Sequence, residues 1–257
     1  MVNAMAYTQF GRSQRLEDIH ICGEFEVDGI KCDEDALSET KRLENIFDDA
    51  QKAREIKTAD HWKISYLNVS SLNAHFEDVA IDNEIIDSDV IGLGETWLEQ
   101  DKSVDFKGYA GYFANFGRGK GQAAFSKLVL SSEPKIVASN KFSSILLKTS
   151  HFNTIFLYLS QNYDKDSLFA LLEDWIQDDI PTTVMGDVNE NSLESSVFEK
   201  FMMSMGFTQL IQEPTFIAGS LLDHLYVNKA MKKKNIFFDK NSCYYSDHDV
   251  ISLYVEK

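Results

Sequence analysis

The chain has 257 residues, of which 44% are hydrophobic, 12% are aromatic and only 3 are proline. This composition excludes a mainly disordered or fibrous protein and predicts a packed globule with room for one large domain and an appendage. The 25 basic and 41 acidic residues give a net charge of −16, which excludes a protein that coats DNA through a broad basic face.

The cysteines and the apolar segments exclude further classes of protein. Cys22, Cys32 and Cys243 are odd in number and lack zinc-ligand spacing, so neither a disulfide scaffold nor a structural zinc site is predicted. No apolar run approaches the roughly 18 residues that cross a bilayer, and the N-terminal pattern is not that of a secretory leader. We therefore expect an intracellular protein, nuclear and not secreted, that does not bind a membrane.

The first 60 residues differ in pattern from the rest of the chain. A short apolar alternation covers residues 20–27, and a charged stretch follows it. The apolar residues of that stretch recur at helical spacing, as Leu43, Ile46, Phe47, Ala50 and Ala53. We interpret residues 1–60 as an appendage with a connector helix, and residues 61–257 as the globular domain.

From Trp62 onward, short apolar runs alternate with amphipathic segments, which predicts an α/β domain. The predicted strands are 64–67, 90–94, 109–115, 123–128, 143–148, 154–158, 182–186, 225–227 and 250–255. The predicted helices are 72–86, 167–177 and 193–205.

Polar residues stand at several ends of these strands, where a buried strand rarely tolerates them. Asn68, Glu95, Tyr158 and the pair Asp187 and Asn189 close four predicted strands. Because side chains at equivalent strand ends share one edge of a sheet, we expect these groups to lie together.

Three further polar residues precede strands instead of following them. Asp223 comes before the strand at Leu225, and the pair Asp247 and His248 comes before the strand at Val250. If these two strands run antiparallel to the others in a mixed sheet, all of these groups reach one rim. The resulting acidic pocket combines oxygen ligands for a hard divalent cation, a carboxylate that can activate water and a histidine that can meet a phosphoryl oxygen. This combination predicts phosphoester chemistry.

Five segments of the chain resemble a known superfamily in sequence and in order. LNVSSL, GLGETWL, MGDVNEN, SLLDHLYV and YYSDHDVISL are similar to motifs of the exonuclease-endonuclease-phosphatase superfamily. GETWL and SDHDVISL resemble the endonuclease domains of retrotransposons and Helitron-like elements more than abasic-site repair enzymes. The resemblance covers residues 62–257.

The resemblance implies a DNase I-like four-layer α/β sandwich of two mixed sheets flanked by helices. It implies a Mg²⁺-dependent endonuclease, with Mn²⁺ as a substitute, that cuts single- or double-stranded DNA to leave 3′-hydroxyl and 5′-phosphate ends. Carried over by position, the resemblance implies that Asn68, Glu95 and Asp247 hold the metal and that Asp187 activates water. It also implies that Asn189, Tyr158 and His248 contact the phosphate and that Asp223 orients His248.

The resemblance departs from the repair enzymes at two positions. Ser70 stands where they carry an acidic residue, and Gln161 stands where they usually carry asparagine, although it is still expected to contact substrate. In the glycine-rich run 117–121, Arg118 and Lys120 could contact phosphate, or the run could be only a hairpin turn.

The N-terminal appendage carries a second resemblance. NAMAYTQFGRSQRLEDIHICGEF and DEDALSETKRL are similar to the C-terminal end of a superfamily 1B DNA helicase, with Arg12 at the position of the arginine finger. The phosphate-binding pattern GxxxxGK[ST] is absent from the chain, so no ATPase is predicted. This resemblance implies a fragment of a mobile-element helicase-endonuclease, with a helicase module of the same polyprotein as partner.

Two other functions stay open at this point. The same pocket could serve a phosphomonoesterase acting on a small or lipid phosphate, or the chain could be a domesticated fragment that binds partners without catalysis. His224, beside Asp223, could compete with His248 for its role, although its strand register favours a structural role.

Overall fold

The computed structural model describes Lys41, Arg42 and residues 60–257, which include the whole predicted globular domain, 61–257. Apart from Lys41 and Arg42, which are helical, the connector helix and the helicase-like motif expected in residues 1–60 lie outside the described residues, so they stay predictions.

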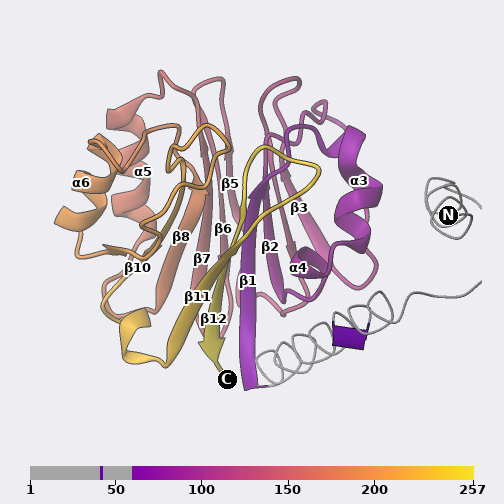
Figure 1. Ribbon diagram of the computed structural model, residues 1–257. Helices are drawn as coiled ribbons and strands as arrows, with labels where there is room; N and C mark the ends of the chain where they lie inside the picture. Colours follow the sequence, from indigo (N-terminus) through magenta and orange to yellow (C-terminus); the bar gives the residue numbers. More distant parts are fainter. Residues whose placement is uncertain (1–40, 43–59) are drawn as a thin grey trace, which may run out of the picture. The chain divides into compact units, whose positions relative to one another are not determined.

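Two six-stranded mixed sheets form the centre of the described domain (Figure 1). The first sheet has the order β11-β12-β1-β2-β4-β3. Its strands in chain order are β1 (His61–Asn68), β2 (Val90–Gly94), β3 (Ala110–Ala114), β4 (Gln122–Ser126), β11 (Ile236–Asn241) and β12 (Val250–Glu256). Only β1 and β2 pair in parallel within this sheet.

The second sheet has the order β5-β6-β7-β8-β10-β9. Its strands are β5 (Lys135–Ala138), β6 (Phe142–Lys148), β7 (Asn153–Leu159), β8 (Thr182–Asp187), β9 (Thr208–Gln209) and β10 (Asp223–Val227). Here only β7 and β8 pair in parallel.

Helices cover the outer face of each sheet, which gives four layers (Figure 1). The helices α3 (Leu72–Ile81) and α4 (Asn83–Ile86) lie on the first sheet, and α5 (Lys165–Trp175) and α6 (Val197–Ser204) lie on the second. A 3₁₀ turn, η3, covers Met231–Lys233. The predicted four-layer α/β sandwich with two mixed sheets is therefore confirmed for the described domain.

The buried residues explain why the two sheets stack. Their inner faces meet in one apolar cluster that includes Tyr66, Phe156 and Met185, while separate clusters lie under α3 and under α5 with α6. Gly92 lets the sheets approach, because a Cβ at this position would lie 2.3 Å from the ring of Phe156. The central strands β1, β2, β7 and β8 thus bury both faces.

Several predicted boundaries are wrong for local reasons. The predicted helix 72–86 is broken at Asp82, whose backbone is extended and whose side chain accepts a hydrogen bond from the N–H of Glu84. The helix predicted from residue 193 begins only at Val197, because Ser196 caps it through the N–H of Glu199. The strands β5, β9 and β11 were not predicted, since each lies at a sheet edge and lacks a wholly buried apolar run.

Strand direction decides where the polar strand ends meet. β10 runs antiparallel to β8, and β12 runs antiparallel to β1, which meets the condition for the polar residues to share one rim. The C-terminal ends of β1, β2, β7 and β8 therefore share one rim with the N-terminal ends of β10 and β12, at the top in Figure 1. We call this edge of the sandwich the catalytic rim, because the residues that the sequence predicts to be catalytic stand there.

Candidate active site

A hydrogen bond joins the two sheets at the catalytic rim. Asn68 ends β1 of the first sheet, and its Nδ2 donates to Oδ2 of Asp187, which ends β8 of the second sheet, at 2.9 Å. The N–H of Asn189 donates to the other carboxylate oxygen of Asp187 at 2.9 Å. Asn189 has a positive φ of 54°, a conformation that asparagine tolerates better than most residues. Both oxygens of the Asp187 carboxylate are thus held in place.

Asp223 and His248 form a buried pair next to Asp187. Asp223 lies directly opposite Asp187 in the β8–β10 ladder, and its Oδ2 is 2.8 Å from Nδ1 of His248. The side chain of His248 also lies against Phe216, with ring centroids 4.9 Å apart. Because Nδ1 is engaged with Asp223, Nε2 is the nitrogen that can donate to a substrate oxygen.

These contacts shift two pKa values in ways that suit acid-base chemistry. Burial, reinforced by the charge of Asp223, raises the pKa of Asp187 to about 7. Burial alone would lower the pKa of His248, but the charge and hydrogen bond of Asp223 outweigh it and raise that pKa to about 9. At neutral pH, His248 is therefore a cation, and Asp187 is poised to accept a proton.

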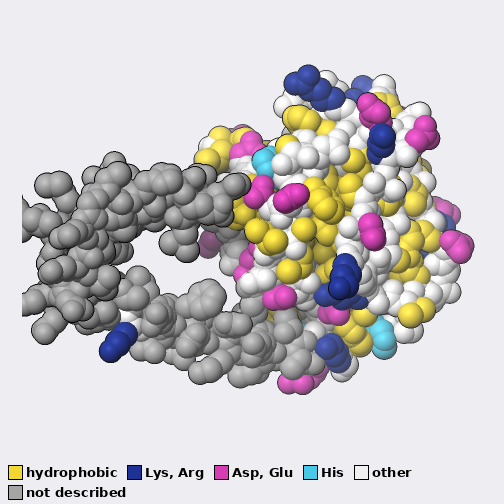
Figure 2. Space-filling view, turned by 90° about the vertical axis from the view of Figure 1, so that its right-hand side faces the viewer, with side chains coloured by type: hydrophobic (Ala, Val, Ile, Leu, Met, Phe, Trp, Pro, Cys, Tyr) yellow, Lys and Arg dark blue, Asp and Glu magenta, His cyan; other side chains and the backbone are white. Residues whose placement is uncertain are grey.

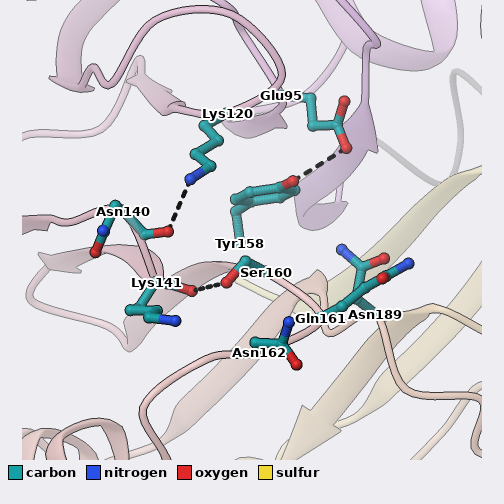
Figure 3. Close-up of a pocket in the computed structure, with 9 residues that line it drawn as sticks. All are labelled: Glu95, Lys120, Asn140, Lys141, Tyr158, Ser160, Gln161, Asn162 and Asn189. Atoms are coloured by element: carbon teal, nitrogen blue, oxygen red, sulfur yellow. Dashed lines mark hydrogen bonds between the residues drawn. The ribbon is translucent and has the colours of Figure 1, made fainter.

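Glu95 and Tyr158 face each other across the rim from β2 and β7 (Figure 3). The Tyr158 hydroxyl donates to Oε1 of Glu95 and to the carbonyl oxygen of Gly119, each at 3.2 Å. Burial and the neighbouring carboxylates Glu95 and Asp187 raise the pKa of Tyr158 far above its usual range. Tyr158 is therefore a neutral hydrogen-bond donor.

Ser70 connects the two other residues expected to bind metal. Its N–H donates to Oδ1 of Asn68 at 3.1 Å, and its hydroxyl donates to Oδ1 of Asp247 at 3.1 Å. The N–H of Ser71 donates to the carbonyl oxygen of Glu95 at 2.9 Å, so the same turn also reaches β2. Asn68 is buried, Glu95 is half-buried and Asp247 is exposed. The structure thus brings the three residues to one rim through this turn.

An open pocket of about 460 Å³ begins at Glu95 and Tyr158 (Figure 3). Its remaining lining is polar and consists of Lys120, Asn140, Lys141, Ser160, Gln161, Asn162 and Asn189. Lys120 and Gln161, which the sequence indicates as candidate substrate contacts, therefore reach the pocket. The Nζ atom of Lys120 donates to the carbonyl oxygen of Asn140 at 2.8 Å.

Arg118 does not line this pocket. Its guanidinium carbon lies 5.9 Å from the ring centroid of Trp97, so the side chain stacks beside the rim. Gly117, Gly119 and Gly121 all have positive φ, which confirms the tight turn that the glycine run predicted. Arg118 can still meet a substrate that extends beyond the pocket.

His224 belongs to a different network from His248. It is fully buried, and its Nδ1 lies 2.7 Å from the hydroxyl of Tyr226, while its Nε2 lies 3.1 Å from the carbonyl oxygen of Glu190. Burial lowers the pKa of His224, so its ring is neutral at neutral pH. These contacts support a structural role.

The donor set at the rim fits a hard divalent cation. Among residues 60–257, Asp187, Asp223 and His248 have potential ligand atoms within 4.8 Å of one another. Oδ1 of Asp223 is buried without a hydrogen-bond partner. The predicted metal ligands Glu95, Asn68 and Asp247 are not members of this group of three; they stand at the same rim and carry the carboxylate and amide oxygens that Mg²⁺ and Mn²⁺ prefer.

On the face shown in Figure 2, acidic and basic side chains are interspersed, and the coloured residues form no continuous basic strip there. Within the part of the chain that the structure describes, no helix is long and apolar enough to cross a membrane.

Comparison with solved structures identifies the fold. An AP endonuclease from Archaeoglobus fulgidus superposes with a TM-score of 0.59 at 17% identity, over 75% of this chain and 98% of that one. A 3′-5′ exonuclease from Neisseria meningitidis gives 0.60 at 18% identity, over 76% and 100%. The endonuclease domain of TRAS1, a telomere-specific non-LTR retrotransposon, gives 0.56 at 14% identity, over 76% and 98%.

These likenesses show that the described domain has the DNase I-like fold, as the motifs implied. No protein-family model and no curated protein sequence matches the chain. At identities below 20%, these likenesses show the fold and not the reaction, because one fold can host many functions.

Sequence reasoning missed several residues of the site. Asn140, Lys141 and Asn162 line the pocket from loops whose sequence carries no motif. Thr215 was also missed, although its hydroxyl accepts the N–H of Asp223 at 2.9 Å. Trp97 stands inside the GETWL motif but was not singled out. The available signal was Glu95, two residues earlier, because a tryptophan that is partly buried usually finds a polar partner for its indole N–H.

Proposed function

We propose that this protein is a Mg²⁺-dependent DNA endonuclease that nicks DNA to leave 3′-hydroxyl and 5′-phosphate ends. One observation carries the proposal: residues from both sheets converge on the catalytic rim, where Asn68 binds Asp187 and His248 binds Asp223. The fold is shared with solved endonucleases and exonucleases, which is consistent with this chemistry.

The metal ion would be held by Glu95, Asn68 and Asp247, with Mn²⁺ able to replace Mg²⁺. When bound, it would neutralise charge on the phosphate. The fit rests on the oxygen-rich donor set, which selects hard cations over zinc.

The protein's own groups supply the proton chemistry. Asp187, held by Asn68 and Asn189, accepts a proton from the attacking water, for which a pKa of about 7 is well matched. As the water oxygen bonds to phosphorus, the bond from phosphorus to the 3′-oxygen breaks, and the released 3′-oxygen takes a proton from solvent water to become the 3′-hydroxyl. His248 donates from Nε2 to a phosphoryl oxygen as charge develops, while Asp223 keeps the ring oriented. The side-chain amide of Asn189 donates a hydrogen bond to the phosphate, and Tyr158 steadies the phosphate by turning its single O–H toward it from Glu95 and Gly119. Lys120, Gln161 and Arg118 contact the flanking nucleic acid.

Supercoiled plasmid tests the proposal directly. We expect the wild-type protein with Mg²⁺ to relax the plasmid by nicking, and DNA ligase to reseal the nicks, because ligase requires a 3′-hydroxyl and a 5′-phosphate. Glu95→Ala and His248→Ala should nick at least about 100-fold more slowly than the wild type. His151→Ala is the matched control, since His151 is exposed and packs on Trp62 at the start of β1. Wild-type activity no higher than that of Glu95→Ala would reject the endonuclease.

A phosphomonoesterase is the second candidate. A solved structure described as a 3′ phosphatase, bound to a product DNA hairpin, shares the fold with a TM-score of 0.59 at 18% identity. Release of inorganic phosphate from a 3′-phosphorylated oligonucleotide or an inositol phosphate, without plasmid nicking, would favour this function. DNA binding without either reaction would favour a non-catalytic fragment.

We further propose that the chain belongs to a mobile element and acts in the nucleus with a helicase module of the same polyprotein. The motifs GETWL and SDHDVISL and the helicase-like motif of residues 1–60 support this context. A helicase reading frame continuous with this one in the flanking DNA, and nuclear staining of the tagged protein, are the expected results.

A further inference from the structure

Trp97 contacts the carboxylate of Glu95 from two residues further along the chain. Its indole Nε1 donates to Oε2 of Glu95 at 3.2 Å. Tyr158 donates to the other oxygen, Oε1, at the same distance. Each carboxylate oxygen therefore has one protein donor, which defines the plane of the carboxylate and leaves further lone pairs for a cation.

The backbone around this contact is conformationally constrained. Glu95 and Trp97 have φ values of 48° and 56°, in a region that residues other than glycine rarely adopt. Backbone hydrogen bonds hold the segment on both sides. They run from Ser71 to Glu95 (2.9 Å), from Leu72 to Thr96 (3.0 Å), from Thr96 to Gly121 (3.3 Å) and from Trp97 to Lys120 (2.9 Å). Such strain persists where the surrounding structure requires it, which is common at functional sites.

The Trp97 ring is also held on its face. The guanidinium carbon of Arg118 lies 5.9 Å from the ring centroid, and the ring is half-buried. An indole N–H can only donate a hydrogen bond, and Nε1 of Trp97 donates to the Glu95 carboxylate. This contact holds the carboxylate without using a lone pair of Trp97 that would compete for the cation. A cation at Glu95 would therefore find one carboxylate orientation already set.

We propose that Trp97 is a positioning residue for the metal site: its indole N–H orients the Glu95 carboxylate for a divalent cation. This inference rests on the proposed function, in which Glu95 is a metal ligand. Partners that hydrogen-bond to a metal ligand raise metal affinity by fixing the ligand's geometry, and their loss typically costs about 10- to 100-fold in affinity. Trp97 acts through Glu95 and does not itself touch the ion or the substrate.

Calorimetric titration of Mg²⁺ and Mn²⁺ into the metal-free full chain tests this role. Trp97→Phe keeps an aromatic ring but removes the N–H, and it should weaken binding about tenfold. Trp62→Phe is the matched control, because Trp62 lies in the same strand as Asn68 but near its opposite end. Its affinity should equal that of the wild type. In a Glu95→Gln background, Trp97→Phe should cause little further loss, since the carboxylate through which Trp97 acts is already neutral.

Indole fluorescence gives a second measurement that does not need Trp97→Phe to fold. The chain has 3 tryptophans, so replacing Trp62 and Trp175 by phenylalanine leaves Trp97 as the single emitter. Its emission should change as Mn²⁺ saturates the site, and Glu95→Gln should shift that titration to higher Mn²⁺.

The outcomes separate this inference from the function on which it rests. If the wild type and Trp97→Phe bind the metal with equal affinity, or if Trp97 emission does not change on metal addition, the role of Trp97 alone is overturned. Equal affinity of wild type and Glu95→Gln overturns the metal assignment of Glu95, and with it the role of Trp97.

Discussion

The two sheets bring carboxylates of opposite accessibility to the catalytic rim. On the second sheet, Asp187 is 1% exposed and Asp223 is fully buried. At the end of the first sheet, Glu95 is half-buried and Asp247 is exposed. Burial makes ionisation costly and shifts pKa values, whereas an open carboxylate keeps its oxygens available to an ion and the ion's water. In the proposed mechanism, proton transfer therefore belongs to the buried carboxylates and cation binding to the more open ones.

The largest expected effect comes from removing the buried base. Asp187→Asn keeps the shape of the side chain but cannot accept a proton, so the nicking rate should fall by about 10⁴, the upper range for a general base. Single-turnover nicking at saturating Mg²⁺ measures this loss. A loss below about tenfold would show that burial of Asp187 serves packing and that the base lies elsewhere.

Asp223 and His248 should act as one unit in the same buried group. Asp223→Asn, His248→Ala and the double variant should each lower the rate by similar factors, on the order of 10² to 10⁴, because either change removes the oriented imidazolium. Rate measurements on all three variants test this. Losses that multiply in the double variant would refute the pairing.

Changing the half-buried Glu95 should have a smaller effect than changing the buried residues, and the effect should be on metal affinity. Glu95→Gln removes the charge and keeps the shape, so Mg²⁺ and Mn²⁺ should bind more than about tenfold more weakly, a larger loss than in Trp97→Phe, while the fold persists. We expect Ca²⁺ to bind the wild type but to support little cleavage, since its longer bonds and looser geometry misplace water and phosphate. Calorimetry and nicking assays with each ion measure both expectations.

The buried pair also predicts a pH-dependent stability. The folded protein holds the His248 proton with a pKa of about 9 instead of 6.5, so the imidazolium stabilises the fold fully below pH 6.5. This contribution, about 3 kcal/mol at most, is lost as the pH rises from 6.5 through 9.

Urea unfolding in the presence of a chelator checks this expectation. The stability difference between wild type and His248→Gln should shrink between pH 6 and pH 9.5. A difference that stays constant over this range would mean that Asp223 does not hold the proton on His248.

The smallest effects are expected outside both carboxylate groups. Lys120→Ala removes a pocket cation, and Arg118→Ala removes a cation stacked beside the rim. Each substitution should weaken DNA binding a few-fold and leave the maximal nicking rate unchanged. Each should also lower the slope of log affinity against log salt concentration by about one unit, which corresponds to one lost phosphate contact. Binding isotherms at several salt concentrations measure this, and an unchanged salt dependence would place that cation outside the DNA contact.

Most of the fold could be predicted because the central strands are buried on both faces. The run 90–94 was predicted with its observed bounds, since β2 is wholly buried and ends at a sharp change to Glu95. The edge strands β5, β9 and β11 could not be predicted in this way, because their mixed burial removes the apolar run. The break at Asp82 depends on a side-chain cap that periodicity alone does not reveal.

The sequence by itself determined which polar groups stand at strand ends, and it placed them at one rim on the condition that β10 and β12 run antiparallel to their neighbours. Only the tertiary structure decided these directions and which of the carboxylates are buried. Asp187 and Asp223 become neighbours because β8 and β10 pair in register, and that proximity, together with burial, shifts the pKa values. The contact of Trp97 with Glu95 depends on two left-handed backbone conformations, which are held by hydrogen bonds to segments distant in the chain.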